Sequence, residues 1–478
     1  MFTRGGHMLS DYELKITRAQ EGFDNILAAL SGELQNKELH DVEEALYSGL
    51  MKLGLSLMES FIEIKGSGRD SETGLPYHKT ENWNYISIFG TLKIPHAYFW
   101  KKGSSGESPL KKELNIPKQH FSYLLQKWSQ MLCVDISHEK SRKALNEILG
   151  VDIWSGQMES INTTASESVD SFYEDREVQE AREPILAIQV DGKGIIMRDN
   201  CKKSVHGHRQ KKGEKNGKKK MSTVSAIYEI ERNIRSVDDI IRDEIDNKTL
   251  SLTVADEKKE IKPQNKIVRA TLEGKDAAFE KLAKEVNRRD PENKKERIAL
   301  MDGEKALASK TNEYLEGFTI ILDLYHVMER LWSLSYFFHK EGSKEALCWV
   351  RKYLTMFLTG KVGYAIGGIR QSAKKKGLKQ SQIDAMEKHL RYFEKRKDYM
   401  KYDEYIKKGY PIGSGVIEGT CRSLVNDRME LTGMHWSWKG AESMLRLRSI
   451  KQNGLWDEYW QYHILNQKEI LYNERKAS

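Results

Sequence analysis

The stretch Ile185-Leu-Ala-Ile-Gln-Val-Asp191-Gly-Lys-Gly194 is a run of apolar and β-favouring residues that ends in one aspartate and a glycine-rich turn. A run of this length, bounded by turn residues, predicts a buried strand. A carboxylate at the end of such a strand lies where an open α/β sheet meets solvent, and such sheets place their functional groups there. We therefore expect Asp191 to belong to a site.

Two further stretches repeat the pattern of an apolar run followed by an aspartate. They are Arg297-Ile-Ala-Leu-Met-Asp302-Gly303 and Phe318-Thr-Ile-Ile-Leu-Asp323-Leu-Tyr-His326. Three strand-end aspartates in one chain indicate converging carboxylates, and converging carboxylates favour a divalent metal. A single Asp-Gly pair after a strand is more often only a turn, so the inference depends on the whole set.

Size and composition limit the class of protein. The chain has 478 residues, which predicts two to four domains, and a formal net charge of +8, which favours a polyanionic partner. The four cysteines are widely spaced and form no CxxC pair, so we expect no zinc ribbon or disulfide framework and a reducing compartment. No apolar run approaches the ~18 residues that a bilayer crossing needs, which predicts a soluble intracellular protein.

The N-terminal third predicts two regions. Residues 1–130 are mainly helical in pattern, with a possible small β-hairpin at 83–100. In residues 131–180, Gly150 ends one short helix and Ser155 can cap a second. Two helices joined in this way are typical of a helix-turn-helix, whose second helix reads the major groove, although an ordinary helical hairpin remains the alternative. The side chains expected to face DNA from the second helix are Gln157, Ser160 and Asn162.

Residues 181–326 predict the first part of an α/β core. Further strands are expected at 194–198 and 223–230, joined by a basic loop that either holds phosphates or is simply solvated, and 235–263 is interpreted as an irregular insertion. With the helices and strands that follow, the order becomes β-β-β-α-β-α-β, which is typical of a ribonuclease-H-like fold. In that fold the first and fourth strands lie side by side, so Asp191 and Asp302 would face each other.

The C-terminal half supplies a third carboxylate. Residues 327–405 predict an all-helical insertion, and 406–478 predict the second part of the core followed by C-terminal helices. Glu418 lies in the first turn of a helix that follows a Gly/Ser loop, where a carboxylate suits the helix dipole. Together with Asp191 and Asp302 it would form a cage of oxygen ligands for two Mg²⁺ ions, replaceable by Mn²⁺. Such a pair of ions serves in-line phosphoryl transfer.

These motifs resemble those of the Mutator-like DDE transposases of bacterial insertion sequences, and most closely those of the Kra-type insertion sequences. The likeness covers about residues 135–462. It is strongest at Val190-Asp191-Gly-Lys-Gly, Met301-Asp302-Gly, Asp323-Leu-Tyr-His326 and Gly413-Ser-Gly-Val-Ile-Glu418-Gly, and at Asp427-Arg428-Met429 with Trp436-Ser437. It implies that Asp191, Asp302 and Glu418 are catalytic metal ligands and that Asp323 and His326 support the site. A hydrogen-bonded core histidine is the alternative for His326. The chain lacks the N-terminal cysteine pairs of many relatives, which puts a zinc-dependent DNA contact there in doubt.

The resemblance implies an enzyme, a transposase that binds the ends of its element, hydrolyses a phosphodiester and joins the freed 3′-hydroxyl to target DNA. Its partners would be double-stranded DNA and further copies of the chain, in the bacterial cytoplasm with the nucleoid and without membrane contact. A nuclease of the same fold that cuts without joining, and a domesticated DNA-binding protein, are the alternatives. Further DNA contacts are expected at Lys193, Lys211, Lys212, Lys218, Lys219, Arg422, Arg428 and Trp436. Trp436 could instead pack at the end of the catalytic helix.

Overall fold

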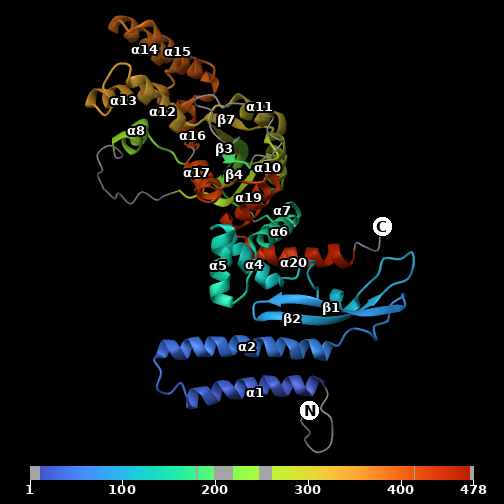
Figure 1. Cartoon of the computed structure of the whole chain (residues 1–478). Coiled ribbons are helices and arrows are strands. Elements are labelled where there is room, and N and C mark those ends of the chain that lie inside the picture. Colours follow the sequence, from blue (N-terminus) through green and yellow to red (C-terminus); the bar gives the residue numbers. More distant parts are fainter. Residues whose placement is uncertain (1–10, 179–180, 199–218, 247–260, 414, 474–478) are drawn as a thin grey trace, which may run out of the picture. The chain divides into compact units, whose positions relative to one another are not determined.

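The computed structural model describes residues 11–178, 181–198, 219–246, 261–413 and 415–473. The chain divides into two compact units. The first consists of the residues before Asp175 together with those from Leu455 onward, and the second runs from Asp175 to Gly454 (Figure 1). The second unit is therefore inserted into the first, and the chain returns to the first unit for its last helix.

The first unit contains two long helices, one β-hairpin and a group of shorter helices. The hairpin expected near 83–100 forms and is longer than expected, since Tyr77 pairs with Phe99. Gly150 ends a helix in the left-handed conformation (φ 64°), as expected. The elements are α1 (Asp11–Ser31), α2 (Leu39–Lys65), β1 (Tyr77–Ser87), β2 (Gly90–Phe99), α3 (Pro109–Glu113), α4 (Tyr123–Cys133), α5 (His138–Leu149), α6 (Ser155–Ser166), α7 (Val169–Asp175) and α20 (Trp456–Tyr472).

Helix α20 belongs to the core of the first unit, although the sequence predicted it as part of the second. The side chains of Tyr459, Trp460 and His463 are almost wholly buried. The hydroxyl of Tyr459 donates to the backbone carbonyl of Ala165, and His463 Nδ1 lies 3.1 Å from the hydroxyl of Ser168. The aromatic face of α20 thus packs on the helices that precede Asp175, which is why this helix leaves the second unit.

The second unit is built on a five-stranded sheet of order β5-β4-β3-β6-β7. β3 pairs antiparallel with β4 and parallel with β6, so the strands that carry Asp191 and Asp302 are neighbours at the sheet centre, as expected. The strands are β3 (Ile185–Ile196), β4 (Lys219–Ile230), β5 (Gln264–Thr271), β6 (Glu296–Met301) and β7 (Thr319–Leu322).

The expected turn after Asp191 does not form, and this corrects two strand assignments. β3 continues through Gly192 and Gly194 and pairs with β4 as far as Ile196. A Cβ atom at Gly192 would lie 3.1 Å from Met221 Cε, so this glycine allows β4 side chains to pass close to the strand. The segment 194–198 is thus not a separate strand, and the third strand is β5, directly after the expected insertion.

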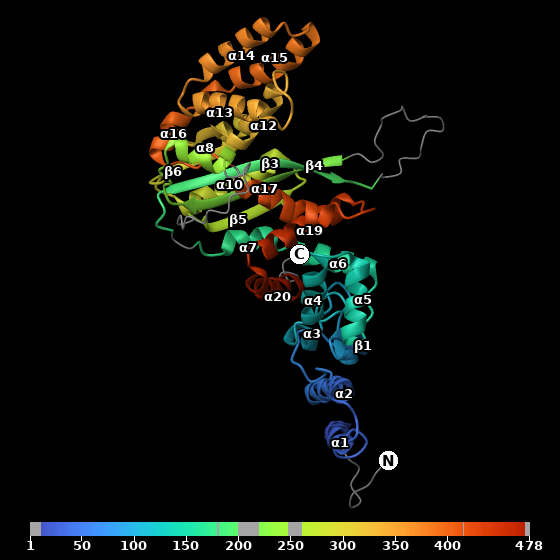
Figure 2. The same cartoon turned by 90° about the vertical axis from the view of Figure 1, so that its left-hand side faces the viewer.

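Helices cover both faces of the sheet. Residues 324–408 form only helical elements and gather on one side of the sheet (Figure 2). α19 packs against β5, and α10 lies against β4. The helical elements are α8 (Val237–Ile241), η1 (Arg242–Asp246), α10 (Lys275–Arg289), α11 (Lys305–Tyr314), α12 (Leu324–Ser335), α13 (Lys344–Leu358), α14 (Val362–Lys376), α15 (Gln380–Glu394), η2 (Lys397–Tyr399), α16 (Tyr402–Lys408), α17 (Gly415–Thr420), η3 (Cys421–Asn426), α18 (Asp427–Met429) and α19 (Trp438–Gln452).

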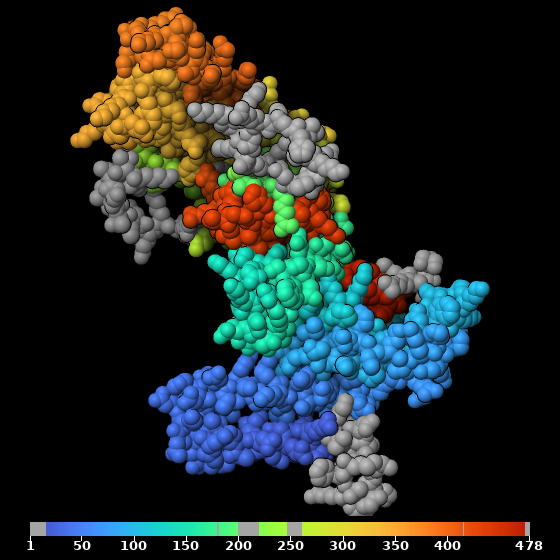
Figure 3. Space-filling view, in the orientation of Figure 1, coloured from blue at the N-terminus to red at the C-terminus, as the bar shows by residue number. Residues whose placement is uncertain are grey.

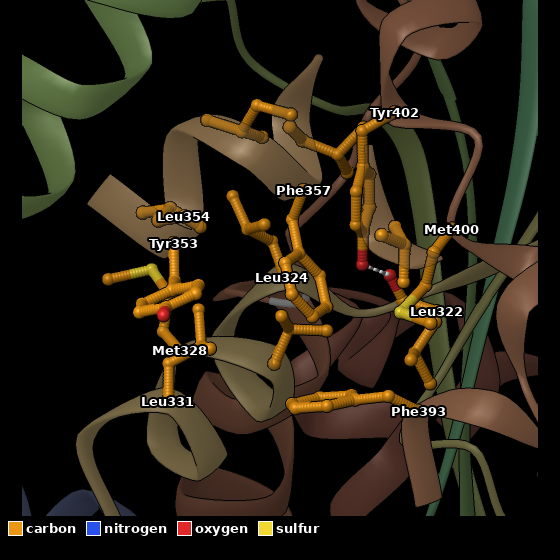
Figure 4. Close-up of a cluster of buried hydrophobic side chains, with 14 of the residues drawn as sticks. Leu322, Leu324, Met328, Leu331, Tyr353, Leu354, Phe357, Phe393, Met400 and Tyr402 are labelled. Atoms are coloured by element: carbon orange, nitrogen blue, oxygen red, sulfur yellow. Dashed lines mark hydrogen bonds between the residues drawn. The ribbon is translucent and has the colours of Figure 1, made fainter. Parts of the chain in front are cut away.

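The helices of 324–408 share one hydrophobic core with the sheet. Residues of β3, β6 and β7 join buried side chains of α12 to α16 in a single cluster. Figure 4 shows Phe357, Phe393 and Leu324 in this cluster, with the hydroxyl of Tyr402 donating to the carbonyl of Leu322 at 2.6 Å. Because of this packing, the predicted helical insertion is fixed on the end of β7. Among the described helices, none combines the length and the apolar character that a membrane crossing requires.

Candidate functional site

Asp191 and Asp302 leave neighbouring parallel strands at the same edge. The pairing of β3 with β6 runs to Val190 opposite Met301, so each aspartate is the next residue of its strand. Asp191 lies within β3 and not at its tip, but its parallel partner ends here, which leaves the carboxylate at the edge of the parallel pair. Asp191 Oδ1 accepts from the amide of Gly192 at 2.6 Å, and Asp302 Oδ1 accepts from the amide of Glu304 at 2.7 Å.

Glu418 is carried to β3 by helix α17. The amide of Ile417 donates to Gln189 Oε1 at 2.7 Å, and Gln189 is fully buried two residues before Asp191. The thiol of Cys421, one turn after Glu418, donates to Asp191 Oδ2 at 3.4 Å. Figure 3 shows the segment of α17 to α19, drawn orange-red, at the surface of the second unit, and Glu418 itself is exposed. α17 and Asp191 therefore meet at one edge of the sheet.

The acids of this edge shift the pKa values of two neighbouring groups, Cys421 and Tyr325. Burial, then the charge of Asp191 and its hydrogen bond, and also the charge of Glu418, raise the pKa of the Cys421 thiol. Burial, then Glu244, and also Asp323 and Glu418, raise the pKa of Tyr325 to about 12. The charge of Glu418 thus reaches side chains beside both Asp191 and Asp323.

Asp323 and His326 form a pair beside these acids. His326 Nδ1 lies 2.6 Å from Asp323 Oδ2, and Asp323 also caps α12 by accepting from the amide of Tyr325 at 3.3 Å. Asp323 is fully buried, whereas Asp302 is partly exposed. The hydrogen bond to Asp323 raises the pKa of His326, and the charge of Asp302 contributes to the same shift. Asp323 is thus occupied in holding the histidine.

The His326–Asp323 pair predicts a pH-dependent contribution to stability. Because the pKa of His326 is raised in the folded chain, the pair stabilises the fold fully below pH about 6.5, the value in the unfolded chain, and loses this effect as pH rises through the folded-state pKa. His326→Gln should cost about 1 kcal/mol at pH 6 and less at pH 9, since the imidazole is 34% exposed and solvent screens it. Thermal unfolding in chelator across this range measures the difference. A difference that grows with pH would contradict the assignment.

The side chains expected to read bases from α6 have mixed surroundings. Trp154 precedes α6 as its N-cap, so Ser155 is the first helical residue and not the cap; Gln157 Oε1 accepts from the amide of Trp154 at 3.0 Å. Gln157 and Ser160 are exposed. Asn162 is 1% exposed and donates to Gln130 Oε1 at 3.0 Å, so its predicted contact with DNA is wrong. It joins α6 to α4 instead.

Some of the residues predicted to contact DNA near the acids are buried, and others are accessible. Arg428 is fully buried with its guanidinium carbon 4.9 Å from the centre of the Trp436 ring, and Trp436 Nε1 donates to the carbonyl of Met429 at 3.1 Å. These two predicted contacts are therefore wrong, and Trp436, which precedes α19, packs against the end of α18. Those that are accessible are Lys193 (partly), Lys219 and Arg422, whereas Lys211, Lys212 and Lys218 lie outside the described residues.

One exposed aromatic ring lies near the basic end of β4. Trp438 is 42% exposed, with Lys220 Nζ 5.4 Å from its ring centre. Lys219 is exposed too, and its ammonium lies 3.2 Å from Glu430 Oε1. Trp438 thus has the accessible face that Trp436 lacks.

Sequence reasoning missed the residues that hold the acids in place. Gln189 is one of them, and the signal for it was available, because it is the one polar residue in the run from Ile185 to Val190. Cys421 and Tyr392, whose hydroxyl donates to the carbonyl of Asp302, had no local signal.

The acids suit a hard cation by donor type. The side chains of Asp191 and Asp302 offer only oxygen ligands. Oxygen ligands select Mg²⁺ or Mn²⁺. Within the described residues, no three His, Cys, Asp or Glu side chains lie close enough together to form a ready-made metal cage.

Comparison of the chain with protein-family models and with curated protein sequences finds no match. The likeness to transposases accordingly depends on the sequence motifs and their spacing.

Proposed function

We propose that the chain is a DNA transposase of an insertion sequence, acting through Asp191, Asp302 and Glu418 on a ribonuclease-H-like core. The observation that carries this proposal is the exit of Asp191 and Asp302 from one pair of parallel strands, with α17 bound beside them through Gln189. Two carboxylates at one sheet edge, with a third on a helix bound beside them, suit two-metal phosphoryl transfer on DNA.

The strand order supports the fold part of the proposal. β3, β4 and β5 are antiparallel neighbours, and β6 and β7 extend the sheet in parallel on the other side of β3. The first and fourth strands of the sheet thus lie together, as expected for a ribonuclease-H-like core. The helices of 324–408 lie between Asp323 and Glu418 in the chain, as the resemblance implies.

The chemistry divides between the ions and the chain. Asp191, Asp302 and Glu418 would hold two Mg²⁺ or Mn²⁺ ions, which when bound activate an attacking oxygen and stabilise a departing one. Lys193, two residues beyond Asp191, and Arg422, four beyond Glu418, are accessible and would neutralise phosphates. Lys219 and Lys220 would extend this contact along the backbone, and Trp438 would stack on an unpaired base. Joining requires two DNA ends and target DNA together, so an oligomer would form on DNA.

A strand-cleavage and joining assay tests the proposal. The substrate is a labelled duplex bearing the element's own end, incubated with full-length chain and Mg²⁺. Cleavage that leaves a 3′-hydroxyl, followed by joining to a second duplex, is the expected result. Cleavage without joining would identify a nuclease. Salt-sensitive binding without any metal-dependent product would identify a DNA-binding protein and overturn the enzyme assignment.

A further inference from the structure

The turn that follows Asp302 is held by two side chains from the helices of 324–408. The hydroxyl of Tyr392, near the end of α15, donates to the backbone carbonyl of Asp302. The Nε atom of Arg396, one turn later, donates to the carbonyl of Gly303 at 2.5 Å. Two consecutive carbonyls of the aspartate turn are thus bound by residues that lie about ninety positions further along the chain.

The ring of Tyr392 lies against two guanidinium groups. The guanidinium carbon of Arg330, on α12, lies 3.5 Å from the ring centre, and that of Arg396 lies 3.9 Å from it. Cations stacked on an aromatic ring are attracted to its electron-rich faces. The neighbouring residue Phe393 is fully buried in the cluster of Figure 4, which anchors this end of α15 to the core.

The turn itself has no free space. Gly303 has a φ of 85°, in the region that only glycine adopts without strain. A Cβ atom built on it would lie 2.5 Å from Arg396 Nε and 2.7 Å from Leu322 Cδ1. The side chains of Arg396 and Leu322 therefore pack directly against the backbone of this turn.

We propose that Tyr392 and Arg396 are positioning residues, which hold the Asp302 turn so that its carboxylate points to a bound divalent cation. The inference rests on the proposed function, because it takes Asp302 as a metal ligand. It adds a role for the helices of 324–408: their packing determines the orientation of one acid of the site. Neither side chain touches DNA or metal in this role.

The test compares metal binding with stability. Tyr392→Phe removes only the donated hydrogen bond, and Arg396→Lys keeps the charge but loses the Nε donor. Substituting a residue that orients a metal ligand typically lowers metal affinity about 10–100-fold. We therefore expect the Mn²⁺ dissociation constant to rise about tenfold in each variant. Electron paramagnetic resonance of free Mn²⁺ measures this constant. Cleavage should recover at saturating metal. Tyr364→Phe is the matched control, since Tyr364 is 80% exposed on α14 of the same region.

The outcomes separate this inference from the proposed function. If the wild type binds Mn²⁺ and cleaves DNA, and both variants bind Mn²⁺ as it does, the positioning role is wrong while the transposase assignment stands. If the variants lose Mn²⁺ binding only in proportion to a lowered unfolding temperature in chelator, their role is structural and the inference is also wrong. If the wild type neither binds Mn²⁺ nor cleaves DNA, both the proposed function and this inference are wrong.

Discussion

Replacing Asp302 by asparagine should reduce the rate of strand cleavage about a thousandfold, which corresponds to about 4 kcal/mol of lost transition-state stabilisation. Asparagine has the shape of aspartate but no charge, and it would bind a divalent cation poorly. Its Oδ1 atom can still accept from the amide of Glu304, the hydrogen bond that Asp302 makes at 2.7 Å. The turn should therefore keep its fold, and DNA affinity should stay close to that of the wild type.

Single-turnover cleavage at saturating DNA measures this effect, and Asp191→Ala and Glu418→Ala should show similar losses. Glu304→Gln is the matched control, because Glu304 is an exposed acid of the same turn whose carboxylate pairs with Lys275. Cleavage by Asp302→Asn at the wild-type rate would remove Asp302 from the metal site. A loss in Glu304→Gln of the same size would show that the general negative charge of the turn matters and not one ligand.

Trp460→Ala should destabilise the first unit by about 3–5 kcal/mol, the usual cost of truncating a fully buried tryptophan. The ring is 1% exposed and lies 5.9 Å from that of Trp456 and 5.4 Å from that of His463, between ring centres. Leu465→Ala on the same helix is the control, since Leu465 is 69% exposed and should change stability little.

Amide hydrogen exchange shows which of the two units the substitution destabilises, because parts of a protein can open independently of one another. Amides of α4, α5 and α6 should lose protection in Trp460→Ala, while those of β3 and β6 keep it. Unchanged protection in α4 to α6 would mean that the last helix does not belong to the core of the first unit.

The sheet shows which strands can be predicted from the local sequence pattern and which cannot. The apolar runs before Asp191, Asp302 and Asp323 predicted three strands, and the predicted order of elements placed the first beside the fourth, which the pairing of β3 with β6 confirms. Gly192 was interpreted as part of a turn because its neighbours along the chain suggest one. The contact that explains it comes from Met221 on β4, and no local pattern contains that information.

The site shows the same limit at the level of side chains. Residues that carry acids could be predicted from the ends of apolar runs, whereas those that hold them could not, because Cys421 and Asp191 are 230 residues apart in the chain. The burial of polar side chains could not be predicted from the sequence either. Arginine and asparagine are usually exposed, yet tertiary neighbours enclose Arg428 and Asn162, and this decided against their predicted contact with DNA.

The split of the first unit around the second has a consequence for synthesis on the ribosome. Its helices α4 to α7 emerge early, but the aromatic face of α20 that completes their core is made only after the whole second unit, which at usual translation rates takes roughly tens of seconds longer. The N-terminal segment must therefore wait with its apolar surface uncovered. A product that stops before α20 lacks these aromatic side chains, so an early stop would release chains whose first unit is incomplete and open to proteolysis and aggregation.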